Sequence, residues 1–203
     1  RSTLFPYTTL FRSERWVAVP RDPRAQPSTY LTRSLERQGD VSTVDPTPLF
    51  PFGHGLSYTA FQWSKVRVDR RPLEPGVPVV TGTDGSVSVS VTVRNTGDRA
   101  GAEVVQLYLH DPVAQVTRPV VRLIGYAKVL LAPGGSKRVS FTVPAEVFAF
   151  TGRHGLPVVE PGDLELRLSA SSAEARHVVP VRLAGAERVL AHRRPFAADV
   201  VVR

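Results

Sequence analysis

The 203-residue sequence contains no cysteine and no methionine, and its only lysines are Lys65, Lys128 and Lys137. Without cysteine the chain cannot form disulfides or thiolate metal sites, although this leaves its compartment open. No apolar run approaches the roughly 20 residues that a membrane-spanning helix needs, so we expect no membrane partner. The lack of methionine, with Arg1 as the first residue, predicts that the sequence does not begin at a native N-terminus.

The formal net charge is +8, and arginine supplies most of it. A nucleic-acid-binding protein would gather its basic residues with aromatic residues on one face. Here the arginines are scattered through every segment. Because a diffuse charge gives only weak, unspecific attraction, we expect no nucleic-acid partner.

Residues 1–13 are of suspect origin. Residues 4–13, LFPYTTLFRS, resemble the translation of a common sequencing adapter, and each of the ten residues matches in order. The alternative is a genuine strand with apolar side chains in a core. A match over ten consecutive residues favours the artefact, so residues 1–13 are left out of the fold prediction.

Residues 14–60 are predicted to be irregular. They are polar and rich in proline as far as Pro48, and proline fixes φ and lacks a backbone donor, which disfavours a long helix or a central strand. Residues 48–61, PLFPFGHGLSYTAF, are denser in apolar side chains. We expect these side chains to dock on one end of the domain that follows, with His54 in a tight turn between two glycines.

From Phe61 onward apolar residues recur with period two, which is typical of β-strands. Six or seven short strands separated by Asn, Gly and Pro turns predict an all-β, antiparallel sandwich over residues 61–185. Residues 186–203 form a tail that could be an added edge strand or a frayed end. The predicted core-facing residues are Val87, Val89, Val91, Val93, Val105, Leu107, Leu109, Val139, Phe141, Val143, Leu164, Leu166, Leu168, Val179, Val181 and Leu183. Gln106 and Tyr108 are expected on the opposite face of their strand.

Three blocks resemble β-glucosidase-type enzymes of glycoside hydrolase family 3 that carry a C-terminal fibronectin type III-like domain. Residues 48–61 look like the segment by which those enzymes enter their last domain. Residues 91–112, VTVRNTGDRAGAEVVQLYLHDP, are similar to the signature of that domain, and residues 118–143 and 160–172 give a weaker match. The resemblance implies an immunoglobulin/fibronectin type III-like sandwich at residues 61–185.

The resemblance also implies the role of the rest. Residues 14–60 would be the remnant of an α/β sandwich domain and a linker. The parent would be a retaining, exo-acting β-glucosidase or β-xylosidase that acts on a β-linked saccharide. This part of it would be inactive on its own and would stabilise the barrel and α/β sandwich domains, which are its expected partners.

No catalytic residue is predicted in this chain. Retaining hydrolysis needs two carboxyl groups about 5 Å apart, and the resemblance implies that both lie in the other domains, the nucleophile in a Ser-Asp-Trp-like motif. No Ser-Asp pair occurs here, and Asp40, Asp45 and Glu36 stand in loop-forming sequence without a rigid scaffold. For Glu103 we expect a surface ion pair or a turn hydrogen bond.

No metal or cofactor site is predicted either, because the five histidines lack the spacing of paired metal ligands. His54 is expected to make a structural hydrogen bond in its turn, with contact to substrate as the alternative. The rival hypothesis for the whole chain is a stand-alone carbohydrate-binding or adhesive β-sandwich. Such a module needs a planar row of exposed aromatics, and both Trp16 and Trp63 are placed outside the strands of such a face.

Overall fold

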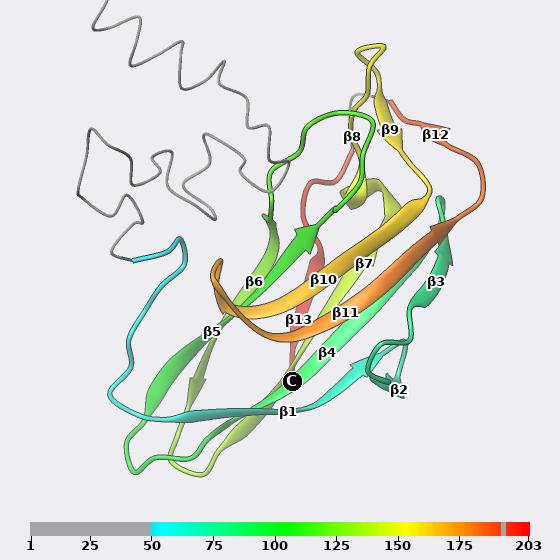
Figure 1. The fold of residues 1–203 in the computed structure, drawn as a ribbon. Helices are drawn as coiled ribbons and strands as arrows, with labels where there is room; N and C mark the ends of the chain where they lie inside the picture. The colour runs from blue at the N-terminus through cyan, green and yellow to red at the C-terminus, as the bar shows by residue number, and fades with distance from the viewer. Residues whose placement is uncertain (1–49, 192–193) are drawn as a thin grey trace, which may run out of the picture.

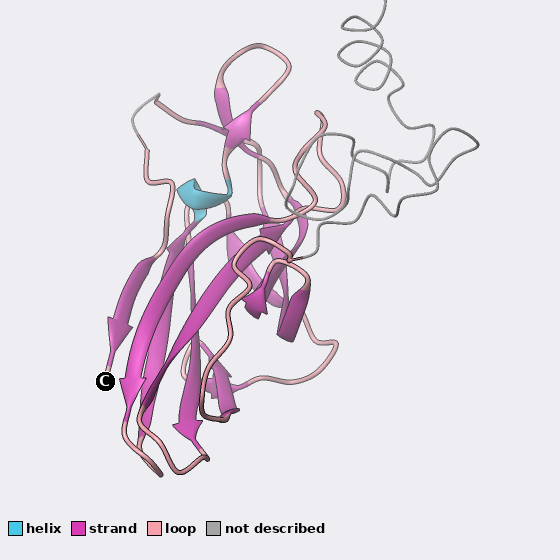
Figure 2. Ribbon diagram, turned by 90° about the vertical axis from the view of Figure 1, so that its left-hand side faces the viewer, coloured by secondary structure: helices cyan, strands magenta, loops and turns pink. Residues whose placement is uncertain are grey.

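The computed structural model describes residues 50–191 and 194–203, which form two packed, mainly antiparallel β-sheets and a small third sheet (Figures 1 and 2). The first sheet consists, in spatial order, of β13 (Asp199–Val202), β7 (Ser136–Pro144), β4 (Ser86–Asn95), β1 (Phe61–Val68) and β2 (Arg71–Pro72). The second consists of β3 (Val79–Gly82), β11 (Glu174–Ala184), β10 (Gly162–Ser171), β5 (Gly101–His110) and β6 (Arg122–Leu131). The predicted all-β sandwich is confirmed.

The small third sheet extends one end of the sandwich (Figure 1). Its strands are β12 (Arg188–Val189), β9 (Pro157–Val159) and β8 (Phe150–Thr151). A 3₁₀ turn, η2 (Ala145–Phe148), leads into it from β7. Within residues 50–191 and 194–203, no helix is both long and apolar enough to cross a membrane.

The core lies between the two large sheets, where the predicted alternation is confirmed strand by strand. All sixteen residues that the period-two pattern assigns to the core are buried, and those of β4 and β7 are fully so. Burying an aliphatic side chain contributes roughly 1.5–3 kcal/mol, so this face accounts for the main stabilisation of the fold. The outward serines and threonines of β4 are less buried than its valines, as a two-sided strand requires.

Two residues on the other face of β5 are buried as well. Gln106 lies opposite the core-facing residues, as predicted, yet the side chains of Gln106 and Tyr108 are only 3% and 1% exposed. Residues 50–55 cross this part of the second sheet and cover Gln106.

Trp63 lies in β1, and its ring is buried in the core. A buried ring cannot serve as a stacking platform, which supports the prediction that Trp63 is no part of an exposed aromatic face that binds sugar.

The C-terminal tail forms an added edge strand, which is one of the two predicted alternatives. β13 pairs with β7 from Asp199 opposite Thr142 to Val202 opposite Val139. Arg203 and Arg138 then exchange two backbone hydrogen bonds of 2.7 and 2.9 Å. This pairing covers the edge of β7, which would otherwise expose unpaired backbone groups.

Candidate functional site

Residues 50–60 are held against the outer face of the second sheet by backbone and amide contacts. Gln106 Nε2 donates hydrogen bonds to Gly53 O at 2.9 Å and to Ala170 O at 2.6 Å. The Tyr108 hydroxyl donates to Gln106 Oε1 at 2.6 Å. Ser172 N donates to Phe52 O at 2.8 Å. Since Gln106 is buried, these bonds replace its contacts with water and fix the path of the segment.

Glycine at position 53 is required by this close approach. Its φ is +78°, a left-handed conformation that residues with a Cβ adopt at a cost. A Cβ there would lie 2.1 Å from Gln106 Oε1. The turn continues to His54, whose N–H donates to Pro51 O at 3.0 Å and whose ring stacks on Phe50 at 4.9 Å. This backbone hydrogen bond closes the turn, and the structural hydrogen bond expected of the His54 side chain stays a prediction.

The other end of the segment is fixed by Asn95, which is fully buried at the end of β4. Asn95 Oδ1 accepts hydrogen bonds from Thr59 Oγ1 at 2.7 Å and from Gly97 N at 3.0 Å. Its Nδ2 donates to Arg99 O and Leu131 O, at 2.7 and 3.1 Å. One side chain therefore joins residues 50–60, the β4–β5 turn and the end of β6.

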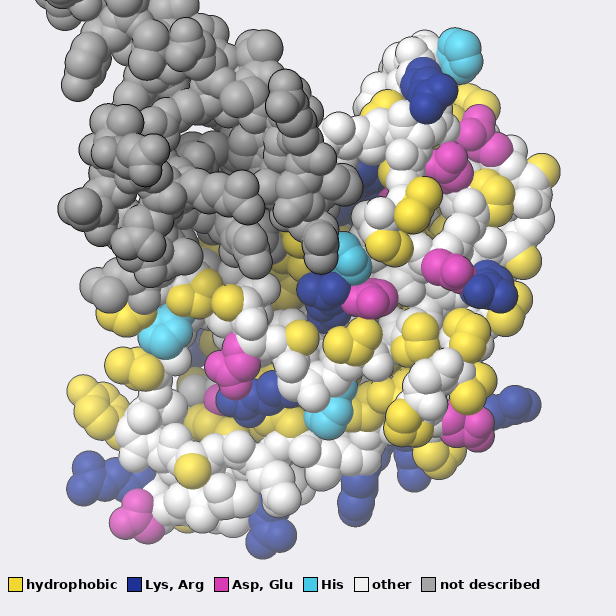
Figure 3. All heavy atoms as spheres, viewed as in Figure 1, with side chains coloured by type: hydrophobic (Ala, Val, Ile, Leu, Met, Phe, Trp, Pro, Cys, Tyr) yellow, Lys and Arg dark blue, Asp and Glu magenta, His cyan; other side chains and the backbone are white. Residues whose placement is uncertain are grey.

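Four large apolar side chains project from this region into solvent. Phe50, Leu56, Tyr58 and the β6 residue Tyr126 are 61%, 90%, 95% and 64% exposed, and we call them the apolar patch. Figure 3 shows hydrophobic side chains gathered along the side of the molecule that this segment follows in Figure 1. The prediction that the side chains of residues 48–61 dock on the sandwich is wrong for Leu56 and Tyr58, because the backbone and not these side chains makes the contacts.

A groove of about 630 Å³ lies beside the patch, between residues 52–61, β5, β6 and the β10–β11 turn. Glu103 and Arg176 line it, and their side chains approach to 3.9 Å. Arg176 also pairs with Glu174 at 3.3 Å and lies over the Trp63 ring at 4.7 Å. Burial raises the pKa of Glu103, and Arg176 partly offsets this. The expected ion pair of Glu103 is present, although its side chain is mostly buried rather than on the surface.

This groove does not resemble a hydrolytic centre. Both of its carboxylates, Glu103 and Glu174, interact with the same guanidinium. A retaining glycosidase instead uses one free carboxylate and one protonated acid with separate roles. Asp40, Asp45 and Glu36 lie outside the described residues, and that no residue of this chain is catalytic stays a prediction.

The other described histidines, His110, His154 and His177, do not line this groove. His110, at the end of β5, donates from Nδ1 to Val120 O at 2.5 Å, and because a carbonyl only accepts, Nδ1 carries the hydrogen. Burial lowers the pKa of His177 in β11. In the described part of the chain, no three histidine, aspartate or glutamate side chains are placed to hold a metal ion.

Residues 103–172 match the family model "Fibronectin type III-like domain". Among curated proteins, the chain is 41% identical over 133 residues to the β-glucosidase BoGH3A of Bacteroides ovatus, which covers 65% of this chain and 17% of that enzyme. It is 37% identical over 159 residues to a β-xylosidase of Formosa agariphila, covering 77% of this chain and 21% of that protein.

Among solved structures, the chain matches the β-glucosidase from Listeria innocua in complex with glucose. The TM-score is 0.61 and the identity 34%, over 70% of this chain and 18% of that one. The chain therefore spans about a fifth of the length of the relatives it matches. Residues 103–172 thus carry a fibronectin type III-like domain, and the sandwich around them is similar to the matching portion of β-glucosidases and β-xylosidases of glycoside hydrolase family 3.

Proposed function

We propose that this chain is a non-catalytic part of a retaining, exo-acting β-glucosidase or β-xylosidase and that it stabilises the catalytic domains of the same parent. The observation that carries this proposal is the apolar patch. Leu56 and Tyr58 are almost fully exposed, although the segment that bears them is fixed at Gly53 and Thr59. A rigid backbone that presents apolar side chains outward supports a docking role.

The relatives support the same role, because they are enzymes about five to six times as long as the matched part. A groove whose carboxylates share one arginine does not favour hydrolysis by this chain alone. The purified chain should therefore hydrolyse aryl β-glucosides and β-xylosides no faster than buffer alone does. Turnover that is lost when Glu103 is changed to Gln would contradict the proposal.

A domain exchange tests the stabilising role. The Listeria innocua β-glucosidase would be produced without its matching portion, and with that portion replaced by residues 50–203 of this chain. We expect the shortened enzyme to have a lower Tm and a lower activity than the intact enzyme. The exchanged enzyme should recover both. Equal behaviour of the shortened and exchanged enzymes would argue against the role.

The alternative, a stand-alone carbohydrate-binding module, has one observation in its favour, since Phe50, Tyr58 and Tyr126 are exposed aromatics. Phe50, however, is stacked on His54, which occupies one face of its ring. Soluble β-glucan fragments titrated into the chain would distinguish the two functions, because a docking patch should give no saturable change in tyrosine fluorescence.

A further inference from the structure

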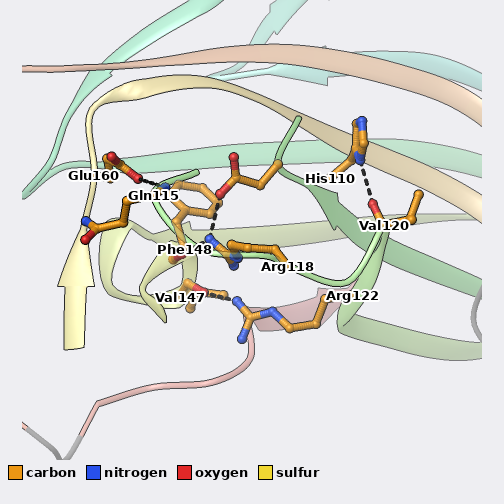
Figure 4. A network of polar contacts seen from close by, with 9 residues as sticks. His110, Gln115, Arg118, Val120, Arg122, Val147, Phe148 and Glu160 are labelled. Atoms are coloured by element: carbon orange, nitrogen blue, oxygen red, sulfur yellow. Dashed lines mark hydrogen bonds and ion pairs between the residues drawn. The ribbon is translucent and has the colours of Figure 1, made fainter. Parts of the chain in front are cut away.

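A second polar site lies at the opposite end of β6, in the connection from β5. Figure 4 shows Arg118 and Arg122 reaching toward the carbonyls of Phe148 and Val147, two consecutive residues of η2. Arg118 Nη1 donates to Phe148 O at 3.3 Å, and Arg122 Nη2 donates to Val147 O. The two guanidinium groups are close enough to repel each other.

Among residues 50–191 and 194–203, only one of these two arginines has a carboxylate partner. Arg118 forms an ion pair of 2.6 Å with Asp111, and both side chains are less than 10% exposed. Its guanidinium also lies over the Phe150 ring at 4.4 Å. Arg118 is therefore neutralised and fully packed.

Arg122 has no such partner in the described part of the chain. Its Nε is buried without a hydrogen bond, and the Val147 carbonyl is the only acceptor that its guanidinium contacts among the described residues. Burial, with Arg118 and Arg194 nearby, lowers the pKa of Arg122 to about 10, so the group remains charged at neutral pH. A largely buried guanidinium without a counter-charge is unfavourable unless an anion joins it.

The local charges define the anion. Arg118 and Arg194 act on Arg122, whereas the carboxylates Asp111 and Glu160 act on Arg118. Arg122 has no carboxylate partner of its own among the described residues, so a single negative charge at its guanidinium would neutralise it. A carboxylate carries that single charge and matches the donor geometry of a guanidinium, whereas a phosphate or sulfate brings a second, uncompensated charge.

We infer that Arg122, supported by η2 and flanked by Arg118, is a binding site for a single carboxylate group. The guanidinium nitrogens that Val147 leaves unused donate to the carboxylate oxygens. The Asp111–Arg118 pair stays intact and serves as the wall of the site. This site is separate from the apolar patch, and the inference does not depend on the proposed function.

The Nε–Hε signal of Arg122 in ¹⁵N–¹H spectra of the full chain reports on the site directly, with Arg122→Lys used to assign it. Sodium acetate titrated against sodium chloride at constant ionic strength should move this signal saturably. The matched control is Arg182 Nε, which already donates to Asp163 at 2.6 Å and should not move. An unmoved Arg122 signal, or equal movement of both signals, would overturn the site.

Two further arms define the ligand. N-acetyl-glutamate 1-amide presents a carboxylate as a protein side chain does. If it binds as tightly as acetate, the ligand can be a side chain of a polypeptide. If only acetate binds, the ligand is a small free acid. Sulfate that acts at lower concentration than acetate would contradict the choice of a monoanion. As a second measurement, acetate should raise the Tm of the unmodified chain more than that of Arg122→Gln, and equal increases would overturn the proposal.

Discussion

The side-chain amide of Gln106 binds the carbonyl oxygen of Gly53 at 2.9 Å across 53 positions of sequence. This contact joins the centre of β5 to the segment that precedes the sandwich. Tyr108 holds the same amide from its other side at 2.6 Å. The position of residues 50–60, and with it the orientation of the apolar patch, depends on this buried trio.

Gly53→Ala should release the segment without unfolding the sandwich. The new Cβ meets Gln106 Oε1 at 2.1 Å and must adopt φ +78°, so we expect a cost of roughly 1–2 kcal/mol. Hydrogen exchange at Ser172 N, which donates to Phe52 O, should accelerate while exchange in β4 is unchanged. Gly55→Ala is the matched control, since a Cβ there meets nothing within 4 Å and its φ is not positive. Equal effects of the two substitutions would show that the segment is not held at Gly53.

Tyr108 should make the fold sensitive to alkaline pH. Burial raises its pKa from 10.0 to about 12, so the unfolded chain loses this proton at lower pH than the folded chain. The stabilisation is complete below pH 10 and is lost as the pH rises toward 12. At 1.36 kcal/mol per pKa unit the full loss is about 2.7 kcal/mol.

Urea unfolding below pH 10 and near pH 12 measures this loss. Tyr108→Phe should show a smaller fall in its free energy of unfolding than the unmodified chain. Tyr126→Phe, at an exposed position, should behave like the unmodified chain. A fall of the same size in both variants would assign the alkaline transition to other groups.

Leu107→Ala tests the predicted core face of β5. The side chain is fully buried between the sheets, so its truncation should lower the free energy of unfolding by roughly 2–4 kcal/mol. Leu130→Ala removes an exposed side chain of the neighbouring strand β6 and should cost less than about 0.5 kcal/mol. Similar costs at both positions would mean that the inward face has been assigned wrongly.

The sequence predicts the sandwich well because the alternation of apolar residues is a local property. Val87 to Val93 share one face whatever lies beside them, since successive side chains of a strand point to opposite sides. For the edge strand β13 the sequence could not decide between two alternatives. Its four residues include three valines, and this pattern does not distinguish a strand paired with β7 from a frayed end.

The burial of Gln106 and Tyr108 could not be predicted from alternation, because it depends on a segment about 50 residues away in the sequence. The glycine at position 53 was the available signal, and it indicated a turn but not the side chain beneath it. Arg122 gave no signal at all. Its hydrogen-bond partner is the backbone carbonyl of Val147, which leaves no trace in residue types.

The central claim, that the apolar patch docks on the catalytic domains of a larger enzyme, is tested most directly by changing the patch within the exchanged Listeria innocua β-glucosidase. Leu56→Ser with Tyr58→Ser should leave the Tm of this chain alone unchanged, because both side chains are at least 90% exposed. In the exchanged enzyme the same pair should lower the Tm and the activity toward those of the shortened enzyme. Val201→Ser, on the edge strand β13 of the other sheet, serves as the control and should lower neither. An exchanged enzyme with unchanged Tm and activity after loss of Leu56 and Tyr58 would contradict the claim.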